Sequence, residues 1–322
     1  MVRLTRGRKT GTVLPWMSPL KTTPTSFMSQ QQQQLAHALF CGIEGTDSSA
    51  VEDALTEIEN QVLGPAQTTG FHSQILADVI DLFNEGFADK QPIDTPYHNL
   101  EHTLQTTLCF AQICLNWELT AEQPSITTEA FQNGLAAALL HDVGYMKDAH
   151  DPEGSGAKHT FCHELRSCDI ATAYLSNLGW DAARIGTVCS IICCTGPLAD
   201  FNSIEFADDT ALLLGQMVCT ADYLGQIADP GYVSKIPALY RELNESDQFR
   251  SIPTEDRNYA SVGELFEGTD TFWKTFVKPR LSDECGGVCE LLTNRETSDN
   301  AYLTQVEANL KLIEELNSTA SN

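Results

Sequence analysis

Apolar residues recur every three or four positions along most of the chain from about residue 34, the spacing that places them on one face of an α-helix. The alternation typical of β-strands is almost absent, and no internal repeat is present. The pattern predicts an all-α fold, a multi-helix bundle that forms a single domain over residues 34–318. The expected helices lie in LAHALFCGIEG, SSAVEDALTEIENQVLG, HSQILADVIDLFNEGF, EAFQNGLAAALLHDVGY, HELRSCDIATAYLSNLG, DAARIGTVCSIICCTG, DDTALLLGQMVCTADYLGQIAD, GYVSKIPALYRELNES, FWKTFVKPRL and NAYLTQVEANLKLIEELN.

A further helix is expected after Pro96, where an apolar stripe at helical spacing runs from Leu100 to Leu115. His98 and His102 stand four residues apart at its start. Because each helical residue turns by about 100°, we expect both histidines on one face of this helix. The segment EAFQNGLAAALLHDVGY is apolar almost all round, which is typical of a central buried helix.

Residues 1–33 lack this helical pattern and are expected to be a disordered, basic N-terminal segment. They are rich in Ser and Thr and end in a run of glutamines, a composition that cannot bury enough apolar surface to fold. The composition suits an organelle transit peptide. Alternatively, the segment precedes the native start, because Met17 or Met28 could each begin a viable protein. Both interpretations stay open.

The charge of the chain is strongly uneven. Residues 1–43 contain five basic and no acidic residues, so the remainder carries 14 basic and 44 acidic residues, a net charge of −30. Binding to a nucleic-acid polymer needs a basic footprint, so this class of function is excluded. A phosphorylated substrate would need local positive charge to offset the acidic body, and a bound metal ion supplies it.

Membrane insertion and a disulfide scaffold are also not expected. The longest apolar runs, such as LAAALL, are far shorter than the roughly 20 residues that a membrane span needs. The 11 cysteines are scattered through apolar stretches. An odd count in a long chain without a secretory signal favours a reduced compartment. We therefore expect an intracellular, cytoplasmic protein with structural cysteines; organelle targeting by residues 1–33 stays open.

Several ionisable residues stand where apolar residues are expected. His141 and Asp142 follow six apolar residues at the end of the buried helix, and Asp222 lies inside the apolar segment GQMVCTADYLGQI. An ionised carboxylate buried there costs several kcal/mol unless it is paired or bound to a metal. Together with His98 and His102, these residues predict a divalent-metal site, and imidazole with carboxylate suits Zn, Mn, Mg or Fe.

The succession YHNLEH, LLHDVGY and TADYLGQ resembles the HD superfamily of metal-dependent phosphohydrolases, over about residues 95–250. The resemblance implies an HD-domain, phosphodiesterase-like helical bundle with one or two divalent metal ions per chain. It implies that His102, His141, Asp142 and Asp222 hold the first metal, and that Asp142 bridges to a second where one exists.

The form YHNxxH is similar to the cyclic-nucleotide phosphodiesterase branch, which implies that His98 is the general acid and His102 a metal ligand. Two features depart from that branch. Tyr145 stands where those enzymes have a histidine after the His-Asp doublet, and no glutamine that would clamp a purine can be placed. The segment HDVGYMKDAHDPEGSGAKHTFCHELRS is closer to bacterial-type HD proteins of the pattern HDVGY…HExRS, so the substrate does not carry over.

Four residues between 154 and 164 are further candidates. By the resemblance, His163 occupies the place of an additional metal ligand, and Glu164 corresponds to a glutamate that holds the attacking water. Glu164 could equally be an acid favoured at a helix N-terminus. Lys158 and Thr160 lie in the loop GSGAKHT, whose flexible amides and lysine suit a phosphate group, although a simple glycine-rich connector is the alternative.

These observations lead us to expect a hydrolase that cleaves a phosphoester with a metal-activated water. The expected substrate is a small phosphorylated molecule, a nucleotide or cyclic nucleotide, attacked in a phosphodiesterase-type reaction. The alternatives are a nucleotide phosphomonoesterase, similar to a 5'-nucleotidase, and a non-catalytic HD-derived binding domain. A di-iron oxygenase of the HD type would need later histidines, and the chain has none beyond His163.

Overall fold

The computed structural model describes residues 47–119, 124–294 and 297–320. The expectations for residues 1–33, and for a helix in LAHALFCGIEG, therefore fall outside the described residues. None of the described helices is long and apolar enough to cross a membrane.

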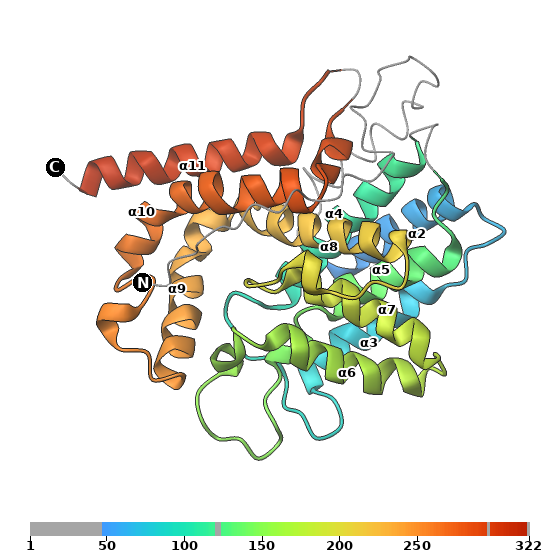
Figure 1. Cartoon of the computed structure of the whole chain (residues 1–322), viewed down its shortest axis with the longest axis horizontal. Helices are drawn as coiled ribbons and strands as arrows, with labels where there is room; N and C mark the ends of the chain where they lie inside the picture. The colour runs from blue at the N-terminus through green and yellow to red at the C-terminus, as the bar shows by residue number, and fades with distance from the viewer. Residues whose placement is uncertain (1–46, 120–123, 295–296, 321–322) are drawn as a thin grey trace.

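The described residues form an all-α structure, which confirms the predicted fold class (Figure 1). They contain no strand, and their only β-type pairs are the isolated bridges Lys90–Asp148 and Thr293–Asn300. Ten α-helices are present in these residues: α2 (Ser48–Leu63), α3 (Phe71–Glu85), α4 (Leu100–Glu118), α5 (Thr128–Leu140), α6 (His163–Asn177), α7 (Ala182–Ile192), α8 (Asp209–Ile227), α9 (Tyr232–Phe249), α10 (Val262–Phe272) and α11 (Ala301–Ala320).

Short helical turns connect these helices. The segment FWKTFVKPRL, expected to be a plain helix, begins with the end of α10 and continues as the π-helical turns η6 (Trp273–Val277) and η7 (Arg280–Glu284). The remaining turns are of the 3-10 type: η1 (Val143–Tyr145), η2 (Gly156–His159), η3 (Cys193–Thr195), η4 (Phe201–Ser203), η5 (Thr254–Asp256) and η8 (Val288–Leu292).

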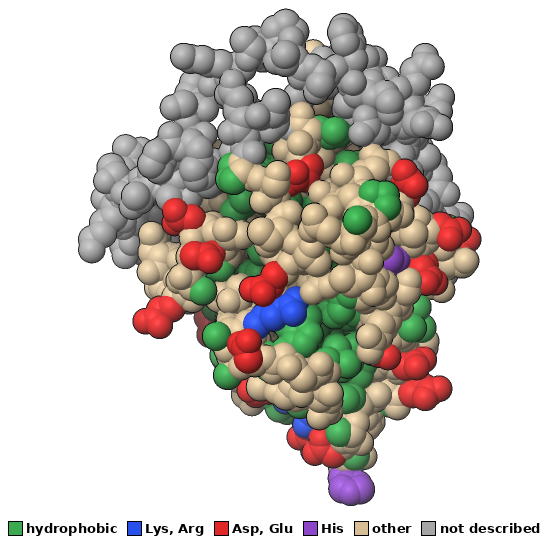
Figure 2. All heavy atoms as spheres, turned by 90° about the vertical axis from the view of Figure 1, so that its right-hand side faces the viewer, with side chains coloured by type: hydrophobic (Ala, Val, Ile, Leu, Met, Phe, Trp, Pro, Cys, Tyr) green, Lys and Arg blue, Asp and Glu red, His purple; other side chains and the backbone are tan. Residues whose placement is uncertain are grey.

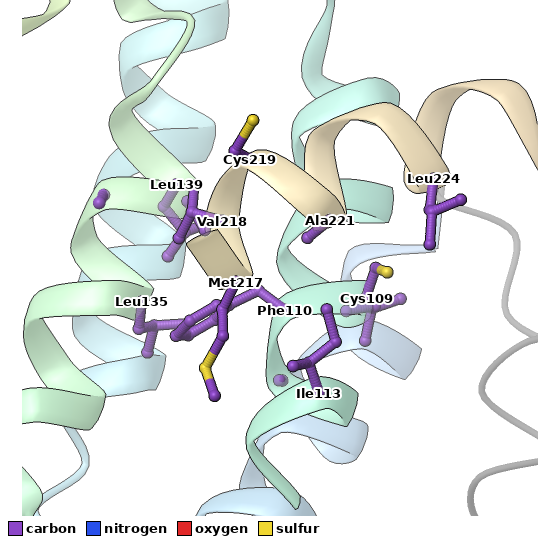
Figure 3. Packing of buried hydrophobic residues seen from close by; sticks show 14 of the residues in the cluster. Cys109, Phe110, Ile113, Leu135, Leu139, Met217, Val218, Cys219, Ala221 and Leu224 are labelled. Carbon is purple, nitrogen blue, oxygen red and sulfur yellow. The ribbon is translucent and has the colours of Figure 1, made fainter. Parts of the chain in front are cut away.

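Helices α4 and α8 form the centre of the bundle and pack against each other more extensively than any other pair. Both are buried on nearly every side, and α5 packs against both. Figure 3 shows Phe110 of α4, Leu135 of α5 and Met217 of α8 meeting between the three helices. Each of these side chains is fully buried, and each such burial stabilises the fold by about 1.5–3 kcal/mol.

Around this centre, α2, α3, α6 and α7 cover one end of the bundle, and α9, α10 and α11 extend from the other (Figure 1). The loop before α4 runs beside the loop before α6. Gln91 N donates to Lys147 O at 2.8 Å, and Ala149 N donates to Asp89 O at 2.6 Å. Gly156 N donates to the Asp94 carboxylate at 2.7 Å. These two loops therefore hold together the segments that carry the predicted site residues.

The acidic composition is visible on the surface. Figure 2 shows acidic side chains spread around one face of the molecule, with a group of basic side chains near its centre and a smaller basic area near its lower edge.

Candidate metal centre

His102 lies in the first turn of α4, and His98 lies outside that helix. Helix α4 begins at Leu100, after Asn99 in an extended conformation. The Asn99 side chain accepts a hydrogen bond from His102 N at 3.2 Å, which satisfies a backbone donor that the helix leaves unpaired. The expectation that both histidines share one helix face is therefore wrong. The helix begins after its N-cap Asn99, so His98 precedes it and His102 lies inside it.

His141 and Asp142 stand at the end of the buried helix α5, as the sequence predicted, and both are 1% exposed. His141 Nδ1 lies 2.8 Å from Ala138 O. A carbonyl oxygen only accepts hydrogen bonds, so Nδ1 carries the proton and Nε2 presents a lone pair. That lone pair faces His102 and Asp142.

Four donor atoms converge at this point. The Nε2 atoms of His102 and His141 are 3.3 Å apart, and each lies 3.3 Å from Asp142 Oδ2. Asp222 Oδ1 lies 3.2 Å from His102 Nε2 and 3.6 Å from His141 Nε2. Metal–ligand bonds of about 2.1 Å separate neighbouring ligands by about 3.0–3.4 Å. The spacing of the two imidazoles and two carboxylates therefore fits a divalent metal ion.

A second observation supports this fit. Asp142 Oδ2 is buried and has no hydrogen-bond partner among the described residues. Converging lone pairs without a donor need a cation between them, either a metal ion or a proton. His102, His141 and Asp142 together have the geometry of a metal-holding group, with ligand atoms all within 4.8 Å of one another.

The tight packing of α4 against α8 brings Asp222 to this group. Gly225 of α8 lies against α4, where a Cβ atom would stand 3.0 Å from Thr106 N. The missing side chain lets the two helices approach closely. The Asp222 side chain is 14% exposed, whereas those of His141 and Asp142 are 1% exposed, so Asp222 lies on the more open side of the cluster.

The charges of the cluster are strongly coupled. Burial opposes the protonation of His102, but the adjacent carboxylates of Asp142 and Asp222 outweigh it and raise its pKa to about 10. Burial likewise opposes ionisation of Asp142 and Asp222, yet the adjacent histidines lower the pKa of both carboxyls. A metal ion must displace the proton from His102. Metal affinity should therefore fall as the pH is lowered.

His163 lies on the other side of Asp142. It opens α6, and its Nδ1 lies 2.8 Å from Thr160 O, which leaves Nε2 to face Asp142 Oδ1 at 3.5 Å. Asp142 thus turns one oxygen to the His102–His141 pair and the other to His163. The roles of His163 as a further ligand and of Asp142 as a bridge stay predictions.

Glu164 follows His163 in α6. Among the described residues, no contact joins its carboxylate to His102, His141 or Asp142. Its Oε2 lies 3.6 Å from His163 Nδ1, is buried and has no hydrogen-bond partner there. Its Oε1 faces Gly196, where a Cβ atom would lie 2.9 Å away. A role in holding water stays a prediction.

Lys158 and Thr160 are occupied within their own loop. Lys158 Nζ is buried and donates to Asp151 Oδ2 at 2.5 Å and to Glu153 O at 2.6 Å. Thr160 Oγ1 donates to Ala157 O at 2.7 Å, and its carbonyl accepts from His163. Thr160 thus contacts the cluster through its backbone carbonyl, which accepts from His163, whereas the Lys158 ammonium group is paired within its own loop. Their expected contact with phosphate stays a prediction.

Glu242 contacts His98 beside the metal-site residues, and no sequence pattern had pointed to it. Its buried carboxylate accepts hydrogen bonds from Tyr97 N at 2.6 Å and His98 N at 3.2 Å. Its Oε2 lies 2.5 Å from His98 Nδ1. Glu242 comes from α9, far along the chain from His98, so it fixes the conformation before α4 and orients the His98 ring.

Tyr145 packs against the two histidines that flank the cluster. Its ring is parallel to those of His98 and His163, with centroid distances of 4.9 Å and 4.8 Å. Its buried hydroxyl has no hydrogen-bond partner among the described residues. Tyr145, the residue that departs from the phosphodiesterase pattern, therefore fills the space between His98 and His163 of α6.

Gly144 lets the segment that carries His141 and Asp142 pack closely against α6. A Cβ atom there would lie 1.9 Å from His163 O and 2.7 Å from Ser167 N. Gly144→Ala is expected to destabilise the protein by about 1–3 kcal/mol, as overpacking does, because backbone must shift. Denaturant unfolding measures this, with Gly186→Ala in α7 as the control, where a Cβ would meet nothing within 4 Å. Equal stability of both variants would contradict the close contact.

The comparisons with known proteins reach only part of this site. Residues 200–313 are similar to the family described as Npun_R2479-like. This match covers about a third of the chain and includes Asp222 and Glu242 but none of the histidines. No curated protein matches the chain.

Proposed function

We propose that this chain is a metal-dependent phosphohydrolase of the HD type that cleaves a phosphoester, in a phosphodiesterase-type reaction on a nucleotide or cyclic nucleotide. The observation that carries the proposal is the convergence of His102, His141, Asp142 and Asp222, with ligand atoms 3.2–3.6 Å apart. These four residues would hold one divalent ion, and His163 with Asp142 would contribute to a second.

A divalent cation bound there would act as a Lewis acid toward the phosphoryl oxygens and lower the pKa of a coordinated water. The protein's own residues then account for the remaining chemistry. His141 is held by the Ala138 carbonyl and His163 by the Thr160 carbonyl. These hydrogen bonds fix each ring with Nε2 toward the cluster and thereby preorganise the ligands.

His98 is the residue placed to donate a proton to the leaving oxygen. Glu242 holds its Nδ1 at 2.5 Å, which leaves Nε2 as the nitrogen that can exchange a proton with substrate. The His98 ring lies 5.6 Å from the His102 ring, and its side chain is 14% exposed. A general acid must be both adjacent to the reacting group and accessible to substrate, and His98 meets both conditions.

The charge of the protein favours a diester over a monoester. The chain carries a net charge of −25, which repels anionic substrates. A phosphodiester carries one negative charge, whereas a phosphomonoester carries about 1.5–2 near neutral pH. The nucleotide part of the proposal rests on the resemblance of YHNLEH to the phosphodiesterase branch. The structure supplies no separate argument for a base.

A substrate panel tests the proposal. The full chain is loaded separately with Zn, Mn, Mg or Fe and assayed on bis-nitrophenyl phosphate, nitrophenyl phosphate, cyclic nucleotides and nucleoside monophosphates. We expect hydrolysis of the diesters in at least one metal form, abolished by a chelator and restored by the metal. Hydrolysis of monoesters alone would replace the diester proposal with a phosphomonoesterase. No hydrolysis in any metal form would contradict a phosphohydrolase.

A further inference from the structure

Three cysteine thiols meet where α6 packs against the end of α7. Cys168 of α6 lies 3.8 Å from Cys193, sulfur to sulfur. Its thiol also lies 3.5 Å from Cys189 O, and the Cys189 thiol lies 3.7 Å from Cys168 O. Cys189 and Cys193 are four residues apart, one helical turn, so Cys168 of the neighbouring helix faces both.

These three cysteines differ from the others in exposure. Cys168, Cys189 and Cys193 are each partly exposed. Six others are buried: Cys109, Cys114, Cys194, Cys219, Cys285 and Cys289. Cys162 is exposed, but no sulfur contact joins it to the cluster. The trio thus combines access to a dissolved oxidant with a second thiol within reach, and a disulfide needs both.

We propose that Cys168 and Cys193 form a reversible dithiol–disulfide site that is oxidised by peroxides. The expectation that all cysteines of this chain are structural is revised for these residues. The sulfur atoms must approach from 3.8 Å to a bond length of about 2.05 Å. The two thiols already contact each other across the packing of α6 against the end of α7, so the proposal requires an approach of less than about 2 Å. Cys189 is the third thiol of the site and lies beside the same partner.

The hydrogen bonding within the trio decides which sulfur reacts first. Either thiol can donate in the contact between Cys168 and Cys193, and the contact with Cys168 lowers the pKa of Cys193 and lowers that of Cys189 to about 7. The same contacts, first with Cys189 and then with Cys193, raise the pKa of Cys168. A thiolate is the nucleophile in thiol oxidation. Of the two thiols with a lowered pKa, Cys193 has its sulfur 3.8 Å from that of Cys168, so we assign Cys193 as the attacking sulfur and Cys168 as the resolving one.

The reaction balances with a peroxide as the oxidant. The Cys193 thiolate attacks one peroxide oxygen, the O–O bond breaks, and a sulfenic acid forms while the second oxygen leaves and is protonated to water. The Cys168 sulfur then attacks the sulfenic sulfur, and the S–O bond breaks. The hydroxyl leaves as water with the proton of the Cys168 thiol. Two thiols and one hydrogen peroxide thus give one disulfide and two waters.

Peptide mapping of the full chain tests the proposal without a variant. Reduced protein is treated with a small excess of hydrogen peroxide, the remaining thiols are blocked with N-ethylmaleimide, and the chain is cut with trypsin without reduction. Cleavage after Arg166, Arg184 and Lys235 separates residues 167–184, with Cys168 alone, from residues 185–235, with Cys189, Cys193, Cys194 and Cys219. We expect a cross-link between these two peptides, and a fall in titratable thiols from eleven to nine that a reductant reverses.

Variants assign the cross-link. Cys193→Ser should remove it, and Cys162→Ser, outside the cluster, should leave its yield unchanged. A cross-link of wild-type yield in Cys193→Ser would mean that another cysteine of residues 185–235 is the partner and would overturn the assignment. Oxidation of the wild-type chain to sulfinic acid without any cross-link of residues 167–184 would overturn the dithiol site itself.

Discussion

His141→Ala and Asp222→Ala are each expected to lose the bound divalent metal while the chain remains helical. Each variant removes one of the four donors whose spacing fits the ion. Loss of a residue that only orients a ligand costs about 10–100-fold in metal affinity, so loss of a ligand should cost more than about 100-fold. Elemental analysis of the purified variants and titration with metal measure this loss, with helicity followed by circular dichroism.

A stability measurement gives an independent readout. A ligand bound only to the native state stabilises it by about 2.7 kcal/mol when its concentration is 100 times the Kd. Added metal should therefore raise the melting temperature of the wild-type chain but not that of either variant. His159→Ala is the matched control, because His159 lies in η2 outside the donor group. Wild-type metal content in both ligand variants would show that the four residues are misassigned.

His98→Asn is expected to keep the metal and the fold but to lower turnover by about 100–10,000-fold, the contribution of a general acid. The reason is that the His98 side chain reaches the cluster from outside α4 and contributes no donor to the His102–His141 pair. The defect should shrink for a substrate with a good leaving group such as nitrophenolate, since such a group needs little protonation. Parallel assays on a cyclic nucleotide and on bis-nitrophenyl phosphate measure this difference.

Glu242→Gln extends the same test. The amide still accepts from Tyr97 N but no longer offers a carboxylate to His98 Nδ1. We expect a smaller loss of turnover with the same dependence on the leaving group. His98→Asn protein that lost its metal, or that was equally impaired on both substrates, would instead make His98 a ligand or a structural residue.

Most of the helices, and three of the four residues proposed to hold the metal, could be singled out from the sequence for one reason. Apolar periodicity identifies a buried helix, and His141, Asp142 and Asp222 are ionisable residues in segments that are otherwise apolar. Such residues stand out against their neighbours. His102 was noticed through its spacing of four residues from His98, and its role as a ligand is implied by the resemblance. The helical pattern wrongly placed His98 in the helix, because periodicity does not register the capping role of Asn99.

Glu242 could not be found in this way. It lies in α9, in the polar segment RELNESD, where the sequence does not distinguish one buried glutamate from the other polar residues. Its contact with His98 joins residues 144 positions apart, and no local pattern reports such a contact. Lys158 shows the opposite case. A lysine in a glycine-containing loop suggests a phosphate site, but the loop's own Asp151 already pairs with it.

Helix α10 was missed for a local reason. Its sequence, VGELFEGTDTF, contains Gly263 and Gly268, which lower helix propensity by about 1 kcal/mol each. Packing against α11 and α9 and the Ser261 side chain, which accepts from Glu264 N at 3.2 Å, stabilise the helix nonetheless. The sequence pattern thus underestimates helices that tertiary contacts support.

The most direct test of the central claim is the position of the metal itself. Crystals of the metal-loaded chain, measured at the absorption edge of zinc or manganese, give an anomalous difference map that locates the ion. The account predicts a peak about 2.0–2.2 Å from the Nε2 atoms of His102 and His141 and from oxygens of Asp142 and Asp222. Metal-loaded protein whose anomalous peaks lie elsewhere, with none among these four side chains, would contradict it.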